Sequence, residues 1–268
     1  MKKFENCLLV ADVDGTLYEG GKAVEKNFER IKYFIENGGV FTIATGRAPK
    51  AAAGIYKEVF CNAPAITFDG AVIFDYEQNK ALDYTEMEQI DKELFTRFAK
   101  QFEKVGLMVQ NVDDIFTITE NEIQKRYIKY RNLTQIKTRL SDIQNEIWLK
   151  AIFTADSDEE INSVISGAAD FEFNGCHFVR TSERYYEYQR KDVNKGSSLE
   201  KLNNILGNRK TFAIGNYYND LELLKAADVS AVVGDSPEDM KSIADFVTCD
   251  CKDGAVAEFI EIIESNKW

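Results

Sequence analysis

An apolar run that ends directly in two aspartates constrains the fold of this chain most. Residues 7–11 (CLLVA) are apolar, and residues 12–16 (DVDGT) follow without a break. A short apolar run of this kind is typical of a buried strand. Two carboxylates cannot be buried at its end without a cation or a hydrogen-bonding partner, because unpaired buried charge is costly. One carboxylate at a strand end can act as nucleophile or metal ligand, and the other can transfer a proton.

Strand and helix signals alternate in the first part of the chain and again after residue 190. We expect buried strands at residues 7–13, 40–44 and 65–68, separated by helices at 24–37 and 49–60. Further helices are expected at 195–206, 218–226 and 255–264, with strands at 211–214, 229–233 and 246–249. This order favours a parallel sheet with right-handed crossovers.

The intervening segment has a different pattern. Thr85 and Glu88 resemble a capping box, which predicts a helix with an apolar face of Met87, Ile90, Leu94, Phe98 and Phe102. Short strands are expected around a polar segment at 125–145, and Ser157 with Glu160 predicts another helix start. The predicted architecture is a Rossmann-like, doubly wound parallel α/β core at residues 1–82 and 189–268, with an inserted α+β cap domain at 83–188.

Composition excludes several classes of function. The formal net charge of −12 makes nucleic acid an unlikely partner, because binding a phosphate backbone normally needs a basic face. No window has the apolar length of a membrane span, and five cysteines do not form a disulfide framework, so we expect a cytoplasmic protein. The single histidine, His177, makes a Ser-His-Asp triad improbable.

Polar residues follow several of the predicted core strands or begin a nearby helix. They are Asp12 with Asp14, Thr45, Lys195, and the run at 215–220 (GNYYND). Ligands bind at the carboxyl edge of open α/β sheets. A carboxylate that attacks phosphorus needs a divalent cation, a cationic side chain, a hydroxyl and an acid, and oxygen ligands suit Mg²⁺.

The chain resembles the haloacid dehalogenase superfamily, and more narrowly the Cof-type sugar phosphatases with a large α/β cap. The resemblance rests on four motifs in order, at residues 12–16 (DVDGT), 44–47 (ATGR), 193–197 (VNKGS) and 215–220 (GNYYND). It implies a Mg²⁺-dependent phosphatase that acts on small phosphorylated metabolites, with sugar phosphates as the first expectation. The oligomeric state is left open.

The resemblance also implies roles for individual residues. Asp12 would be the nucleophile that forms an aspartyl-phosphate, and Asp14 would be the acid and base. Phosphate would be bound by Thr45, Gly46 and Lys195, with Arg47 at the substrate rim. Mg²⁺ would be held by Asp12, the Asp14 carbonyl, Asn216 and Asp220, supported by Asn219.

Two positions depart from the family pattern. The fourth motif usually has Gly-Asp, and this chain has Gly215 and Asn216. The turn after the third core strand usually has Asn-Gly-Ala, and this chain has Asp69, Gly70 and Ala71. Either change could weaken or redirect activity. One alternative is a catalytically weakened regulatory or binding module on the same fold, which the neutral Asn216 motivates. A phosphomutase on the same fold is a further alternative, which no feature of the sequence requires.

Overall fold

The structure is a computed structural model that describes residues 2–130 and 134–265. It divides into two compact units. Unit 1 comprises Met1–Ala48, Ala52–Tyr84 and Asn194–Trp268, and unit 2 comprises Pro49–Ala51 and Thr85–Val193. Residues 1 and 266–268 of the predicted core, and 131–133 of the predicted insertion, lie outside the described residues. In the described part of the chain, no helix has both the length and the apolar character needed to span a membrane.

Unit 1 is built on a parallel sheet with the order β16-β15-β14-β1-β4. Its strands are β1 (Cys7–Ala11), β4 (Val40–Ile43), β14 (Lys210–Gly215), β15 (Val229–Val232) and β16 (Phe246–Val247). Leu9 and Ala11 of β1 belong to the core on one face, and Leu8 and Val10 belong to the core on the other. A strand buried on both faces reads as a continuous apolar run, which explains the CLLVA signal. The predicted α/β fold class is confirmed.

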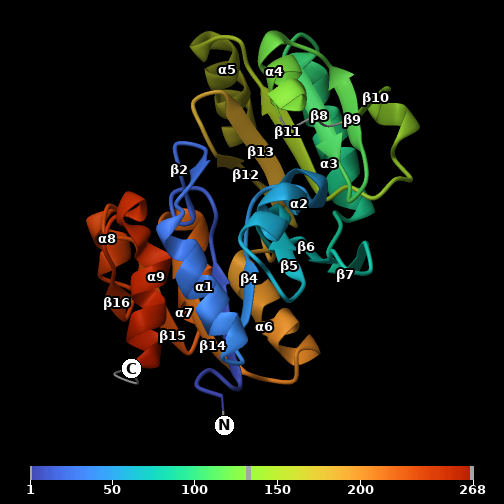
Figure 1. The fold of residues 1–268 in the computed structure, drawn as a ribbon. Helices are drawn as coiled ribbons and strands as arrows, with labels where there is room; N and C mark the ends of the chain where they lie inside the picture. Colours follow the sequence, from blue (N-terminus) through green and yellow to red (C-terminus); the bar gives the residue numbers. More distant parts are fainter. Residues whose placement is uncertain (1, 131–133, 266–268) are drawn as a thin grey trace. The chain divides into compact units, whose positions relative to one another are not determined.

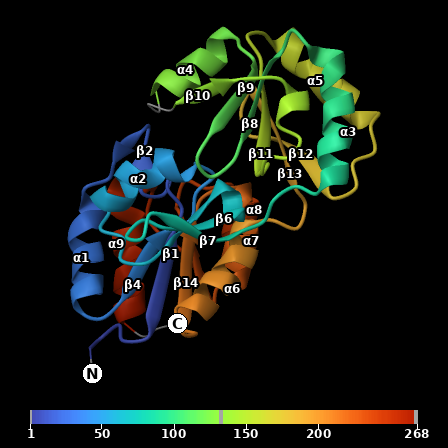
Figure 2. The same ribbon diagram turned by 90° about the vertical axis from the view of Figure 1, so that its right-hand side faces the viewer.

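Helices cover both faces of this sheet (Figures 1 and 2). One face packs on α1 (Lys26–Glu36), α2 (Pro49–Glu58) and α9 (Cys251–Glu264). The other packs on α6 (Lys195–Ile205), α7 (Leu221–Ala226) and the single turn α8 (Glu238–Lys241). The doubly wound arrangement leaves the carboxyl ends of β1, β4 and β14 at one edge of the sheet, and the predicted site residues follow these ends.

The third predicted strand is only partly as expected. β5 (Ala65–Thr67) makes one parallel bridge, Ala44 to Ile66, with the end of β4. Its main pairing is antiparallel, to β6 (Val72–Asp75), which pairs in turn with β7 (Lys80–Tyr84). The sequence does not predict this second sheet. A small hairpin of β2 (Tyr18–Glu19) and β3 (Lys22–Ala23) completes the strands of unit 1.

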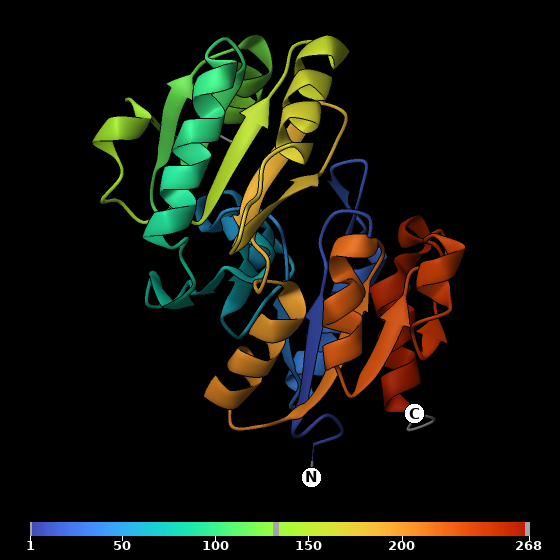
Figure 3. The same ribbon diagram turned by 180° about the vertical axis from the view of Figure 1, so that it is seen from behind.

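Unit 2 has a mostly antiparallel six-stranded sheet with the order β10-β9-β8-β11-β13-β12. Its elements are α3 (Gln89–Ala99), β8 (Gly106–Gln110), β9 (Ile115–Thr119), α4 (Glu122–Tyr130), β10 (Gln135–Lys137), β11 (Lys150–Thr154), α5 (Asp158–Ala169), β12 (Cys176–Arg180) and β13 (Tyr185–Arg190). Helices α3 and α5, teal and yellow in Figure 3, pack on one face around Phe98, Trp148 and Phe153. Helix α4 lies on the other face, where Tyr127 packs against Met108 and Ile152.

Two sequence expectations for unit 2 are wrong in detail. Helix α3 begins at Gln89 with Glu88 at its N-cap, and no side chain caps it, so the capping box at Thr85 does not form. Ile90 is 51% exposed and does not belong to the apolar face. The polar segment at 125–145 contains most of α4 and all of β10. By contrast, Ser157 caps α5 by accepting from the backbone of Glu160.

Candidate active site

Asp12 is buried directly after β1, the strand between β14 and β4 in the parallel sheet of unit 1. Its backbone N–H donates to the Ile214 carbonyl at 2.9 Å, so the residue continues the pairing of β1 with β14. Its side chain accepts from Lys195 Nζ at Oδ1 (2.6 Å) and from Thr16 Oγ1 at Oδ2 (3.3 Å). Both carboxylate oxygens are therefore oriented by hydrogen bonds, and Asp12 itself is almost completely buried.

Lys195 is the first residue of α6, and its side chain is fully buried. Asn194 caps this helix in a reciprocal box with Ser197, which fixes the direction in which the first turn leaves. The Asn-x-x-Ser spacing in the sequence is the local signal for this box. A cation at a helix N-terminus opposes the helix dipole, so local helix stability does not explain Lys195.

Asp220 is the second carboxylate on the Lys195 ammonium. Its Oδ1 lies 2.6 Å from Lys195 Nζ, and its Oδ2 accepts from the backbone N–H groups of Asn216 (2.9 Å) and Tyr217 (3.2 Å). The side chain is fully buried. Both oxygens of Asp220 are thus engaged in holding Lys195 and the turn after β14.

Burial and charge act in opposite directions on this cluster. Burial and the negative charge of Asp220 raise the pKa of Asp12 above the usual carboxyl range, although Lys195 opposes the shift. Burial alone would lower the pKa of Lys195, but the carboxylates of Asp12, Asp220 and Asp69 together raise it above its usual value. The Lys195 ammonium is therefore charged at neutral pH, and it is the cation that these carboxylates share.

Asp14 and Arg47 form an ion pair at the exposed side of the site. Arg47 donates from Nε to Asp14 Oδ2 at 2.9 Å and from Nη2 to Oδ1 at 2.5 Å. The predicted rim residue Arg47 is thus bound to the predicted acid-base residue. Thr45 is buried, and its Oγ1 accepts from the backbone N–H of Arg47 at 3.2 Å.

Asp69 lies on the turn after β5 and reaches the same group of loops. Its Oδ1 accepts from Asn219 Nδ2 at 3.3 Å. A Cβ placed on Gly46 would lie 2.7 Å from Asp69 Oδ2, so the carboxylate covers the Gly46 backbone. The structure therefore brings Asp69 to the predicted site, together with Asn219 and the Thr45-Gly46 turn.

The donor set of the site fits a hard divalent cation. Asp12 offers a carboxylate, Asp14 a backbone carbonyl and Asn216 an amide oxygen, all of which are oxygen ligands of the kind that Mg²⁺ prefers. The Asn216 side chain lies over Gly15, whose φ of +90° and lack of a Cβ permit the close approach. Among the described residues, no group of three or more His, Cys, Asp or Glu side chains is arranged to hold a metal ion.

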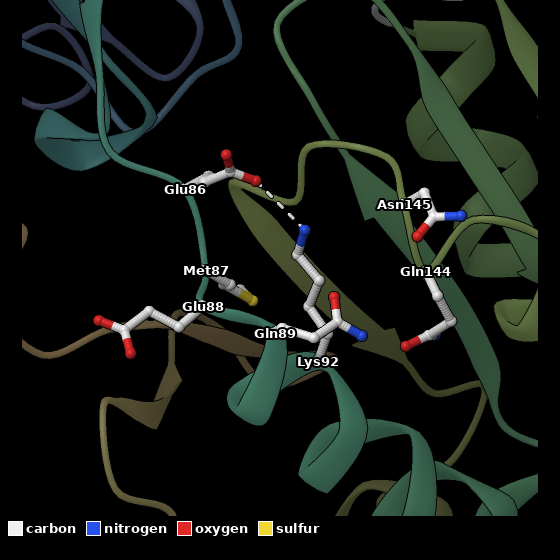
Figure 4. Close-up of a pocket in the computed structure, with 7 residues that line it drawn as sticks. All are labelled: Glu86, Met87, Glu88, Gln89, Lys92, Gln144 and Asn145. Atoms are coloured by element: carbon white, nitrogen blue, oxygen red, sulfur yellow. Dashed lines mark hydrogen bonds and ion pairs between the residues drawn. The ribbon is translucent and has the colours of Figure 1, made fainter.

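Unit 2 contains a cavity of its own. It has a volume of about 480 Å³ and is lined by Glu86, Met87, Glu88, Gln89, Lys92, Gln144 and Asn145 (Figure 4). The nearly buried Lys92 ammonium donates to Glu86 Oε2 at 3.2 Å and to the Glu146 carbonyl at 2.7 Å. None of the predicted site residues lines this cavity.

The family model described as haloacid dehalogenase-like hydrolase matches residues 9–260, which include every predicted site residue. The chain belongs to the haloacid dehalogenase-like hydrolases. The resemblance seen in the four motifs is therefore confirmed, and so is the prediction of an enzyme of the hydrolase class.

Two phosphatases of Bacillus subtilis match this hydrolase over almost their whole length. The 5-amino-6-(5-phospho-D-ribitylamino)uracil phosphatase YitU of Bacillus subtilis is 21% identical over 263 residues, which cover 95% of this chain and 96% of the relative. Phosphatase YwpJ of the same organism is 24% identical over 282 residues, covering 95% and 98%. The prediction of a phosphatase agrees with the names of both relatives.

Solved structures share the fold of this hydrolase. A haloacid dehalogenase-like hydrolase from Bacteroides thetaiotaomicron superposes with a TM-score of 0.83 at 22% identity, covering 97% of this chain and 99% of that chain. A sugar phosphatase of HAD subclass IIB superposes with a TM-score of 0.77 at 20% identity, covering 95% and 98%.

Proposed function

We propose that this hydrolase is a Mg²⁺-dependent phosphatase that works through an aspartyl-phosphate on Asp12. The observation that carries the proposal is the buried Lys195 ammonium, which lies 2.6 Å from carboxylate oxygens of both Asp12 and Asp220. A nucleophile held by a fixed cation at a strand end suits the attack of a carboxylate on phosphorus.

The proposed first step breaks the bond between phosphorus and the leaving oxygen. An Asp12 carboxylate oxygen bonds to phosphorus, and Asp14, as the carboxylic acid, gives its proton to the leaving oxygen. Lys195, Thr45 and the Gly46 turn would bind the phosphoryl oxygens. In the second step Asp14, now a carboxylate, takes a proton from water, and the water oxygen bonds to phosphorus as the bond to Asp12 breaks.

The metal would be held by Asp12, the Asp14 carbonyl and the Asn216 amide oxygen. When bound, Mg²⁺ offsets the negative charge of the phosphoryl group and of the attacking carboxylate. Asp220 would support the metal site by fixing Lys195, through its Oδ1, and the turn that carries Asn216, through its Oδ2.

The proposed substrates are small phosphorylated metabolites of the sugar or polyol type. The name of YitU specifies a phosphorylated ribityl compound, and a structural neighbour is called a sugar phosphatase. We propose that unit 2 is the cap that selects the leaving group. A cytoplasmic location is also proposed, supported by the five cysteines, all of which are free thiols.

Hydrolysis of p-nitrophenyl phosphate with and without Mg²⁺ tests the function. We expect turnover that depends on Mg²⁺, and we expect Asp12→Asn to lower it by about four orders of magnitude or more while the protein stays folded. The neutral Asn216 supports a second candidate, a phosphate-binding module without turnover. Full activity of Asp12→Asn contradicts the mechanism, and absence of turnover at every Mg²⁺ concentration favours the binding module.

A further inference from the structure

Asp69 sits on a strained turn that holds it against the site. Both Phe68 and Asp69 have left-handed backbone angles, with φ of +52° and +53°. Asp and Asn tolerate this region best among residues with a side chain, whereas Phe is rarely found there. Three backbone bonds fix the turn: Phe68 N to Arg47 O (3.0 Å), Asp69 N to Thr45 O (3.1 Å) and Ala71 N to Phe68 O (3.1 Å). Such strain persists only where the surrounding structure determines it, and it clusters at functional sites.

The Asp69 carboxylate is placed between two predicted site motifs. It covers the Gly46 backbone on one side and accepts from Asn219 Nδ2 on the other. Its negative charge is one of the charges that keep Lys195 protonated, after those of Asp12 and Asp220. Asp69 therefore interacts electrostatically with Lys195, together with Asp12 and Asp220.

The carboxylates of Asp12, Asp220 and Asp69 all act on the single ammonium of Lys195. Each of them makes the electrostatic potential at the site more negative, which favours a divalent cation there.

We propose that Asp69 is a positioning residue that supplies the third carboxylate of this cluster, so that the site attracts a divalent cation although Asn216 is neutral. This inference rests on the proposed function. The Asp69 carboxylate lies beside the Thr45-Gly46 turn and Asn219.

If Asp69 acts through its negative charge, Asp69→Asn should change the affinities for Mg²⁺ and for phosphate in opposite directions. Asparagine fits the left-handed turn and has the same shape, so the variant should fold. It should bind Mg²⁺ about tenfold more weakly in isothermal titration calorimetry, because one attracting charge is lost. The metal-free variant should bind inorganic phosphate more tightly than the wild type, seen as a larger rise in melting temperature at the same phosphate concentration, because one repelling charge is lost.

Two further variants complete the test. The double variant Asp69→Asn/Asn216→Asp restores the number of carboxylates and should return Mg²⁺ affinity to within about threefold of the wild type. Glu36→Gln removes a charge from an exposed residue at the end of α1, and it should change the affinity for neither Mg²⁺ nor phosphate.

Each outcome bears on the inference. If Asp69 has only a structural role, Asp69→Asn should bind both Mg²⁺ and inorganic phosphate more weakly than the wild type, and this result would overturn the inference. An unchanged Mg²⁺ affinity, or a wild-type protein that binds no Mg²⁺, would also overturn it. If wild type and Asp69→Asn differ as predicted but neither hydrolyses any phosphate ester, the inference stands and the proposed phosphatase function fails.

Discussion

Lys195 Nζ lies 2.6 Å from Asp12 Oδ1, although 183 positions separate the two residues in the chain. The contact joins the end of strand β1 to the first turn of α6. The ammonium also reaches Asp220, so one buried cation ties together three segments of unit 1. Its removal would leave two buried carboxylates without a cation, which is among the costliest changes that a single substitution makes.

We therefore expect Lys195→Met to lower the free energy of unfolding by about 3–5 kcal/mol, measured by urea denaturation of the metal-free protein. Lys201→Met is the matched control, because Lys201 lies on the same helix but pairs with Asp83 at the surface. That exposed pair is worth about 1 kcal/mol or less. Equal losses in the two variants would mean that the buried cluster is not held by its cation.

The ion pair between Arg47 and Asp14 makes a prediction about leaving groups. The guanidinium orients both oxygens of Asp14, and a lysine ammonium cannot reproduce this two-point contact. In Arg47→Lys, we expect kcat for alkyl phosphates, whose leaving oxygen needs a proton, to fall about tenfold. The rate with p-nitrophenyl phosphate, which has a better leaving group, should fall less.

Asp14→Asn is the reference variant for this comparison, since it should widen the same difference further. If Arg47→Lys slows both substrates equally, Arg47 contributes to binding the phosphate at the rim, as the motif suggests, and does not orient Asp14.

The sequence was most informative where a single local property decided the structure. The run at β1 is apolar on both faces because helices cover both sides of the sheet, and the aspartates after it lie at the ligand-binding edge. Predictions from the sequence are incomplete where long-range contacts decide the structure. Nothing local separates β5, which pairs mainly with β6, from a further parallel strand. Arg47 pairs with Asp14 across 33 positions, and spacing alone does not predict that contact.

Arg190 joins the segments through which the chain enters and leaves unit 2. It donates to Asp192 at 2.8 and 2.6 Å, to Glu88 Oε1 at 3.3 Å and to the Glu86 carbonyl at 3.4 Å. We expect Arg190→Met to speed hydrogen exchange of backbone amides at 86–88 and 191–193, because local opening becomes easier. The melting temperature should change little, since the core around Trp148 is untouched.

Arg139→Met is the control for this measurement, because Arg139 is exposed in the same unit and pairs only locally, with Asp142. Unchanged exchange at both segments in Arg190→Met would show that other contacts hold them together.

Glu264 stabilises unit 1 by an amount that we expect to depend on pH in the acidic range. Its carboxylate accepts from Lys3 Nζ (2.6 Å), Arg30 Nη2 (2.8 Å) and Tyr33 OH (2.8 Å), which joins the end of α9 to α1. These hydrogen bonds, with that from Lys3 the strongest, lower the pKa of Glu264 from its ordinary value near 4.5 to about 2. A carboxyl whose pKa is lower in the folded state contributes its full stabilisation at pH values above its pKa in the unfolded state. This contribution is lost as the pH falls through its pKa in the folded state.

Wild type should therefore melt a few degrees higher than Glu264→Gln at pH 7, and the difference should shrink as the pH falls from about 4.5 towards 2. Thermal unfolding of both proteins at a series of pH values measures this directly. Glu261→Gln, on the same helix with a longer and more exposed contact to Arg30, should show almost no difference at any pH. If the difference in melting temperature between wild type and Glu264→Gln stays constant with pH, the effect comes from packing of the side chain. An effect of the carboxylate charge would be lost when the carboxyl is protonated.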